Sequence, residues 1–168
     1  SEEKLPEYYQ SDDYISHTDS KRNLFEKVYH FVRQFSLKKK LNLINSFVVQ
    51  QEDPDLSKEK RLLDIGCGTG DFLQTAQQNN WHVSGIEPNQ HARQIANKKT
   101  NNSVFDTAQL LKFDESTFDV ITLWHVLEHL PDLEEQIAIF KKLLKPSGTL
   151  IIAIPNYKSY DAKYYKQF

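Results

Sequence analysis

Three of the five glycines in this 168-residue sequence fall within five consecutive positions, at Gly66, Gly68 and Gly70. The apolar run 61–65 just before them predicts a β-strand, and residues 72–78 after them predict a helix. Glycines at such a junction permit positive φ angles and close approach of a ligand to the backbone, while the free N–H groups of the following helix point toward it. A simple tight turn needs one glycine rather than three. The sequence therefore predicts a ligand-binding loop.

An acidic residue stands at the end of the second predicted strand. Glu87 follows the apolar run 81–86, roughly 20 residues beyond the glycines, where a carboxylate accepts hydrogen bonds from ribose hydroxyls. Pro88 is expected to start the next helix because its φ angle is fixed. We therefore predict that Glu87 binds the sugar of a nucleoside-type ligand.

Two common nucleotide-binding patterns do not fit the loop. The dinucleotide fingerprint G-x-G-x-x-G requires its third glycine at the position of Asp71. A P-loop requires a lysine directly after its last glycine, and none is present. The loop is therefore predicted to bind a ligand other than a dinucleotide or a nucleoside triphosphate.

A second candidate motif is His125-x-x-Glu128-His129, which matches the H-x-x-E-H pattern of inverted zinc peptidases. Such a peptidase needs both histidines on one helical face and a third ligand, and no histidine follows His129, although an acid could take that role. A predicted strand leads directly into the motif, and short patterns often recur by chance. We therefore predict no metal site.

Cys67 is the only cysteine, which excludes an internal disulfide and favours a cytoplasmic protein.

The elements that must position these residues alternate between short apolar runs and helical segments. This order predicts an α/β fold, a doubly wound Rossmann-like parallel sheet of about five strands, within a core of residues 59–168. Pro131 is expected in the first turn of the last helix. The expected strands are 61–65, 81–86, 103–105, 118–123 and 149–154, and the expected helices are 72–78, 89–98 and 132–145.

Residues 1–58 are expected to form the N-terminal part, with a lid segment at 1–19 followed by two amphipathic helices, the second capped by Ser36. Charge is uneven here: residues 1–20 hold six acids and one lysine, whereas residues 21–40 hold seven basic residues and one acid. The basic stretch is either a solvated helix face or a docking surface for an acidic partner.

The segment from Leu63 to Gly70 resembles the first motif of class I S-adenosylmethionine-dependent methyltransferases, and the resemblance extends from about Lys60 to Asn156. It implies S-adenosylmethionine as cofactor and S-adenosylhomocysteine as product. It also implies that Asp64 reaches the cofactor's amino group, and that Gly66, Cys67, Gly68 and Gly70 pack against its methionine part. This cofactor has no phosphate, so a lysine in the loop is not needed.

Residues 118–121, 125–130 and 143–148 are similar to the subfamily that includes the ubiquinone-biosynthesis O-methyltransferases. This resemblance places Trp124 and His125 near methyl transfer and implies that sheet strands six and seven, usual in the family, are missing here. Thr107 stands where the family has an acid for adenine, with Asp106 one place earlier. The other cofactor-binding residues that it implies are Pro88, Ala108, Gln109, Tyr14 and His17.

Together these features predict methyl transfer to an unidentified acceptor, a small-molecule hydroxyl that is free or lipid-linked. His125 is either the general base for that hydroxyl or a residue that packs at the site wall. The alternative is a module that binds the cofactor without turnover. Nucleic acid is not expected as a partner, peripheral membrane contact through residues 21–40 is a hypothesis, and the oligomeric state stays open.

Overall fold

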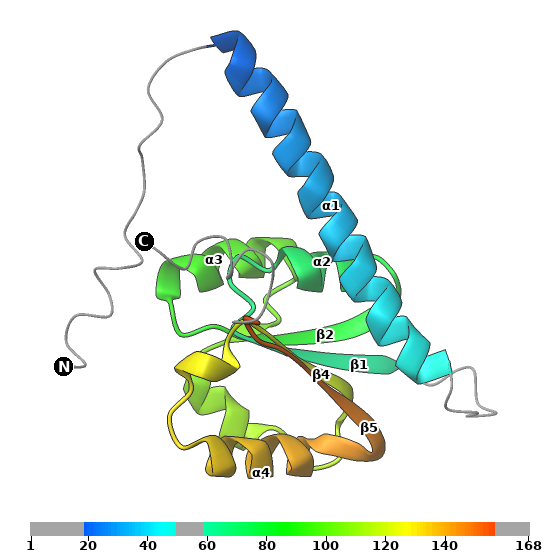
Figure 1. The fold of residues 1–168 in the computed structure, drawn as a ribbon. Helices are drawn as coiled ribbons and strands as arrows, with labels where there is room; N and C mark the ends of the chain where they lie inside the picture. Colours follow the sequence, from blue (N-terminus) through cyan, green and yellow to red (C-terminus); the bar gives the residue numbers. More distant parts are fainter. Residues whose placement is uncertain (1–18, 50–58, 157–168) are drawn as a thin grey trace. The chain divides into compact units, whose positions relative to one another are not determined.

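The structure, a computed structural model, describes residues 19–49 and 59–156. Its centre is a sheet of five parallel strands in the order β3-β2-β1-β4-β5 (Figure 1). The expected α/β fold with a doubly wound parallel sheet is therefore confirmed. The strands are β1 Lys60–Ile65, β2 Trp81–Ile86, β3 Val104–Phe105, β4 Phe118–Trp124 and β5 Leu144–Ala153.

Helices cover both faces of this sheet (Figure 1). On one face, α2 (Asp71–Gln77), α3 (Gln90–Lys99) and the second half of α1 (Asp19–Val49) pack over a buried cluster that includes Leu41, Ile44 and Leu62. On the other face, the cluster includes Leu63, Ile121 and Phe140, under α4 (Leu133–Leu143) and the 3-10 helices η3 (Thr107–Lys112) and η4 (Leu127–His129). The last four residues of β1, Leu62 to Ile65, are buried, and three of them are apolar, as expected for a strand covered on both faces.

The chain divides into two compact units, residues 1–36 and residues 37–168, and α1 runs across the boundary without a break. The expectation of two separate helices was therefore wrong. Ser36 does not interrupt the helix because its neighbours are good helix formers and residues 19–49 contain neither glycine nor proline. None of the helices in the described part of the chain combines the length and the apolar character that a membrane crossing requires.

Three expected boundaries were also wrong. Asn89, not Pro88, precedes the first turn of α3, because the Asn89 side chain accepts a hydrogen bond from the Ala92 N–H at 3.0 Å. Helix α4 begins after Asp132, whose φ of 47° is left-handed, so Pro131 lies outside the first turn. The same helix ends at residue 143 because β5 begins five residues earlier than expected, with a register irregularity opposite the start of β4.

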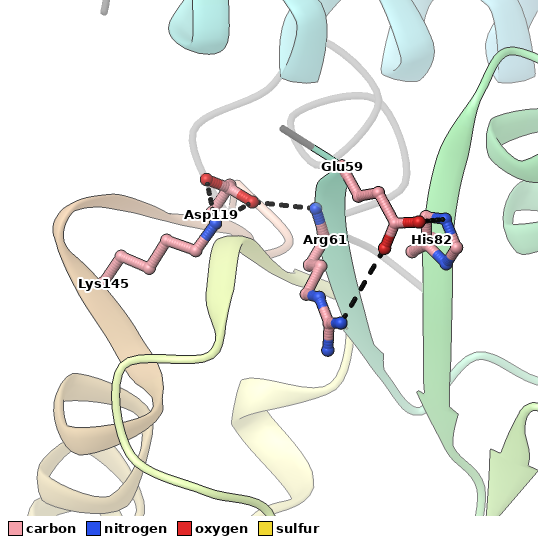
Figure 2. Close-up of polar contacts among 5 residues, drawn as sticks. All are labelled: Glu59, Arg61, His82, Asp119 and Lys145. Carbon is pink, nitrogen blue, oxygen red and sulfur yellow. Dashed lines mark hydrogen bonds and ion pairs between the residues drawn. The ribbon is translucent and has the colours of Figure 1, made fainter. Parts of the chain in front are cut away.

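Charged side chains join the strands at the amino-terminal edge of the sheet (Figure 2). Asp119 on β4 accepts the Arg61 backbone N–H and the Lys145 ammonium, each at 2.8 Å. Beside it, Glu59 pairs with His82 at 3.0 Å and with the Arg61 guanidinium at 3.8 Å. The glycine loop lies at the opposite edge, at the carboxyl ends of the strands, where ligands bind in such sheets. The charged pairs at the amino-terminal edge therefore hold the strands together and lie away from the expected ligand site.

Candidate functional site

The three loop glycines adopt positive φ angles of 68°, 55° and 75°, but the space around them differs. A Cβ on Gly66 would stand 2.5 Å from the Val126 side chain, and one on Gly70 would stand 2.8 Å from the Ala96 Cβ. A Cβ on Gly68 would meet nothing within 4 Å. Gly66 and Gly70 therefore let the loop pack against its neighbours, whereas Gly68 borders open space that a ligand can enter.

Neighbouring elements hold the loop in place. The backbone N–H groups of Gly66 and Cys67 both donate to the Ile86 carbonyl at the end of β2, at 2.7 and 3.1 Å. The Lys99 ammonium donates to the Thr69 carbonyl and pairs with Asp71, both at 2.9 Å. The residue that breaks the dinucleotide fingerprint, Asp71, thus anchors the loop to α3.

Glu87 is buried at the end of β2, with 8% of its surface exposed. One carboxylate oxygen accepts the Gly68 N–H at 2.8 Å and the other accepts the Asn89 N–H at 2.9 Å. A carboxylate has about four lone-pair sites. One acceptor site therefore remains on each oxygen, which matches the two hydroxyls of a ribose. Arg93 donates to the Glu87 and Pro88 carbonyls and fixes this turn.

Asp64 lies inside the sheet, with 2% of its surface exposed. Burial raises its pKa to about 7, while the hydroxyl of Thr122, which donates to it at 2.6 Å, and the Lys40 cation oppose the rise. The resemblance assigned Asp64 to the cofactor's amino group. In the structure its one hydrogen-bonded side-chain partner among the described residues is Thr122.

Cys67 is a neutral packing residue within the loop. Burial raises the pKa of its thiol, and the nearby Asp64 and Glu87 carboxylates raise it further. Its sulfur also fills the space beside Gly85, where a Cβ would come within 2.7 Å of it. The thiol is therefore uncharged near neutral pH and offers no charge to a ligand.

Trp124 and His125 end β4 at the same edge of the sheet. The indole N–H of Trp124 is buried without a hydrogen-bond partner among the described residues, and its ring meets Phe72 edge-on at 5.7 Å between centroids. His125 is exposed and adopts a left-handed φ of 58°. Its backbone N–H donates to the Ala153 carbonyl at 2.8 Å. A non-glycine residue in that region is uncommon and often marks a functional position.

The H-x-x-E-H motif does not form a helical metal site. Only residues 127–129 are helical, as the single 3-10 turn η4, and His125 lies outside it. The two histidines therefore do not share a helical face. Within residues 19–49 and 59–156, no three His, Cys, Asp or Glu side chains gather as a metal site would require.

The residues expected at the adenine follow β3. Thr107 and Ala108 are exposed and Gln109 is half-buried, at the start of η3. Asp106 caps this turn: its side chain accepts the Ala108 N–H at 3.0 Å, and its carbonyl accepts the Gln109 N–H at 3.2 Å. These two N–H groups are therefore engaged by the protein itself. Tyr14 and His17 lie outside the described residues.

Lys40 is a cation beside the candidate site that the sequence patterns did not indicate. It lies on α1 three residues after Leu37 and four before Ile44, so it interrupts the apolar stripe that faces the sheet. Its ammonium stands 4.4 Å from the centroid of the Trp124 ring. A lysine within the buried stripe was the available signal.

These groups fit S-adenosylmethionine. Open space beside Gly68 admits a ligand, Glu87 keeps acceptors for a ribose, and the Trp124 indole offers an unused buried donor. The cofactor's amino acid part carries an ammonium and a carboxylate. The Asp64 and Glu87 carboxyl groups and the Lys40 cation lie at the same edge of the sheet. No phosphate has to be accommodated.

Comparison with known proteins agrees with this site. A family model described as "Methyltransferase domain" matches residues 21–168. The ubiquinone biosynthesis O-methyltransferase of Coxiella burnetii is 28% identical over 131 residues, covering 73% of this chain and 56% of that protein. The demethylmenaquinone methyltransferase of Staphylococcus aureus is 28% identical over 170 residues, covering 88% and 70%. The chain therefore spans little more than half the length of the first of these relatives.

A solved structure supports the fold. A SAM-dependent methyltransferase of Thermotoga maritima, described as a possible histamine N-methyltransferase, is 24% identical with a TM-score of 0.59, covering 86% of this chain and 63% of that one. The resemblance to methyltransferases seen at residues 63–70 is confirmed. The chain belongs to the methyltransferase domain family and has the fold of a class I S-adenosylmethionine-dependent methyltransferase.

Proposed function

We propose that this chain holds S-adenosylmethionine at the carboxyl edge of β1, β2 and β4 and takes part in methyl transfer to the hydroxyl of a small molecule. The observation that carries the proposal is the Glu87 carboxylate, which is bound to the Gly68 N–H beside open space and keeps two free acceptor sites. The bound cofactor supplies a methyl group on a positively charged sulfur, which makes displacement by an oxygen favourable.

The chain's own contribution is mainly orientation. A displacement of this kind is accelerated by holding the acceptor oxygen in line with the methyl group. The glycine loop and Glu87 fix the nucleoside, and the end of β4 forms the adjoining wall. These parts are rigid because the loop is hydrogen-bonded to β2 and α3.

His125 is the candidate for accepting the hydroxyl proton. Its backbone is held by the hydrogen bond to Ala153 on β5, and its side chain is exposed at the edge where the other site residues lie. A positioned general base contributes roughly 10²- to 10⁴-fold to the rate. We assign it the role of general base.

The similar protein from Coxiella burnetii is named for ubiquinone biosynthesis and the one from Staphylococcus aureus for demethylmenaquinone, which supports a small, lipid-linked acceptor. The exposed apolar residues Val28, Phe31 and Val32 on α1 support contact with a lipid surface, because Lys27 and Lys38 lie on the same helix and residues 21–40 are basic. Sedimentation with anionic and with neutral vesicles tests this contact. Recovery with vesicles equal to recovery without them, or Phe31→Ser without effect, counts against it.

Isothermal titration with S-adenosylhomocysteine tests the cofactor site. Glu87→Gln should weaken binding roughly 10- to 100-fold, because it removes a charged acceptor from a buried site. The matched control is Glu115→Gln, an exposed carboxylate before β4, which should bind as the parent does. No binding by the parent at high micromolar concentration contradicts the proposal. Binding without methyl transfer to any hydroxyl acceptor would instead support a cofactor-binding module.

A further inference from the structure

One helix, α3, is hydrogen-bonded to three of the elements that surround the candidate site. Near its start, Arg93 donates to the Glu87 carbonyl at 2.6 Å. Asn97 exchanges two hydrogen bonds with the backbone of the first residue of β3, at 2.9 and 2.8 Å. In the last turn of the helix, Lys99 donates to the Thr69 carbonyl in the glycine loop at 2.9 Å. The side chains of α3 therefore reach the turn after β2, the neighbouring strand and the loop.

Close packing brings α3 against the loop. A Cβ on Gly70 would stand 2.8 Å from the Cβ and 3.0 Å from the Cα of Ala96, so a glycine is needed there for the helix to approach. Residues three apart share a helical face, which places Lys99 on the face of α3 that meets the loop. A lysine in the last turn of a helix is favourable for the helix dipole alone. The Lys99 side chain is nevertheless turned to the loop, with 27% of its surface exposed.

Lys99 also forms an ion pair at the start of α2. Its ammonium stands 2.9 Å from one carboxylate oxygen of Asp71, and the other oxygen accepts the Thr69 hydroxyl at 2.8 Å. The side chain of Asp71 is 25% exposed, so water screens this pair less than it screens an ion pair on the open surface. Hydrogen bonds between charged groups are also shorter and stronger than those between neutral groups. The pair therefore fastens the loop to α3 more firmly than the carbonyl contact alone.

The peptide unit that follows Thr69 is held at both of its polar groups. Its carbonyl accepts the Lys99 ammonium, and its N–H donates to the Cys67 carbonyl at 3.1 Å. Gly68 lies inside this turn, and a glycine has other backbone conformations of similar energy open to it. The 2.8 Å hydrogen bond from the Gly68 N–H to Glu87 needs only one of them. Lys99 therefore disfavours loop conformations that would break this bond.

We propose that Lys99 is a positioning residue for the nucleoside part of the cofactor, because it keeps the glycine loop in its binding conformation before the ligand arrives. This inference rests on the proposed function and adds to the site a residue that acts on the ligand only through the loop. The ion pair lies outside the two apolar clusters of the core, so its loss affects the loop more than the fold. Apparent affinity falls in proportion to the fraction of molecules in the binding conformation.

Titration calorimetry with two ligands tests the effect on affinity. Lys99→Met should weaken the binding of S-adenosylhomocysteine and of 5′-methylthioadenosine by the same factor, roughly 3- to 10-fold, as the fraction in the binding conformation falls. The two ligands share the nucleoside and differ in the amino acid part. Lys99→Arg keeps the charge and the donors and should restore part of the lost affinity. Lys98→Met is the matched control, an exposed lysine in the same helical turn, and should leave both affinities unchanged.

Hydrogen exchange measured by mass spectrometry separates an effect on the loop from an effect on the whole fold. In the ligand-free Lys99→Met protein, amides of residues 66–72 should exchange faster than in the parent, whereas those of β1 and β4 should not change. Asp71→Asn provides the same comparison if Lys99→Met does not fold. It removes the ion pair and leaves the contact between Lys99 and the Thr69 carbonyl, so its effects should be in the same direction and smaller.

Three results would overturn the proposal. They are unchanged affinity for both ligands, weaker binding of S-adenosylhomocysteine alone, and exchange that rises in β1 and β4 as much as in the loop. The last of these would make the ion pair a contributor to global stability only. A parent protein that binds neither ligand would instead show that the proposed function itself fails.

Discussion

Asp64→Asn should change how the stability of the fold depends on pH. The pKa of Asp64 is raised from the usual 3.8 to about 7 by burial, so between these values the folded protein keeps a proton that the unfolded chain has released. The contribution of Asp64 to the free energy of unfolding is therefore fully present below pH 3.8 and is lost as the pH rises toward 7. Each pKa unit corresponds to about 1.4 kcal/mol, and between pH 5 and pH 7 the expected loss is about 2 kcal/mol.

Asparagine carries no charge at either pH, so the variant should lack this loss. Urea unfolding of both proteins at pH 5 and at pH 7 gives four free energies of unfolding, and their double difference cancels every titration that the two proteins share. The parent should lose about 2 kcal/mol more than Asp64→Asn over this interval. A double difference near zero, or a parent that gains stability, would refute the burial argument. Thr122→Val removes a hydrogen bond that lowers this pKa and should move the loss to higher pH.

Other residues give sharper local tests. Gly70→Ala should destabilise the fold by about 1–3 kcal/mol in urea, because its φ is 75° and its Cβ would meet Ala96 at 2.8 Å. His125→Ala should lower kcat with a hydroxyl acceptor roughly 10²- to 10⁴-fold and leave S-adenosylhomocysteine affinity unchanged in calorimetry. Cys67 should resist iodoacetamide at pH 8 until urea unfolds the chain, because burial raises the pKa of its thiol; labelling of the folded protein, detected by mass spectrometry, would contradict this.

The features that sequence could predict are those set by local patterns. Short apolar runs bounded by turn residues indicated all five strands, and three glycines after the first run indicated the loop. The spacing of Glu87 indicated its place beside that loop, and the structure brings its carboxylate to the Gly68 N–H. These signals depend on backbone geometry within one or two neighbouring elements.

The features that sequence missed depend on contacts between distant elements. Helix α1 is continuous through Ser36, and its second half packs on the sheet through residues such as Ile44. The hydrogen bond between Asp64 and Thr122 joins residues 58 positions apart, so no local sequence pattern predicts it. A count of charge along the chain places Lys40 on a basic surface, whereas its position around the helix places it beside the buried residues Leu41 and Ile44.

The polar groups of the site are only partly satisfied within the chain, and this has a consequence for affinity. Glu87 uses one acceptor site on each oxygen, while the Lys40 ammonium and the Trp124 indole have no hydrogen-bonded partner among the described residues. Buried groups of this kind cost stability until a ligand completes them. Because the cost is borne in the free protein, a ligand that satisfies these groups gains affinity that a ligand without matching groups does not gain. The site is therefore expected to discriminate between ligands by the hydrogen-bonding groups that they carry.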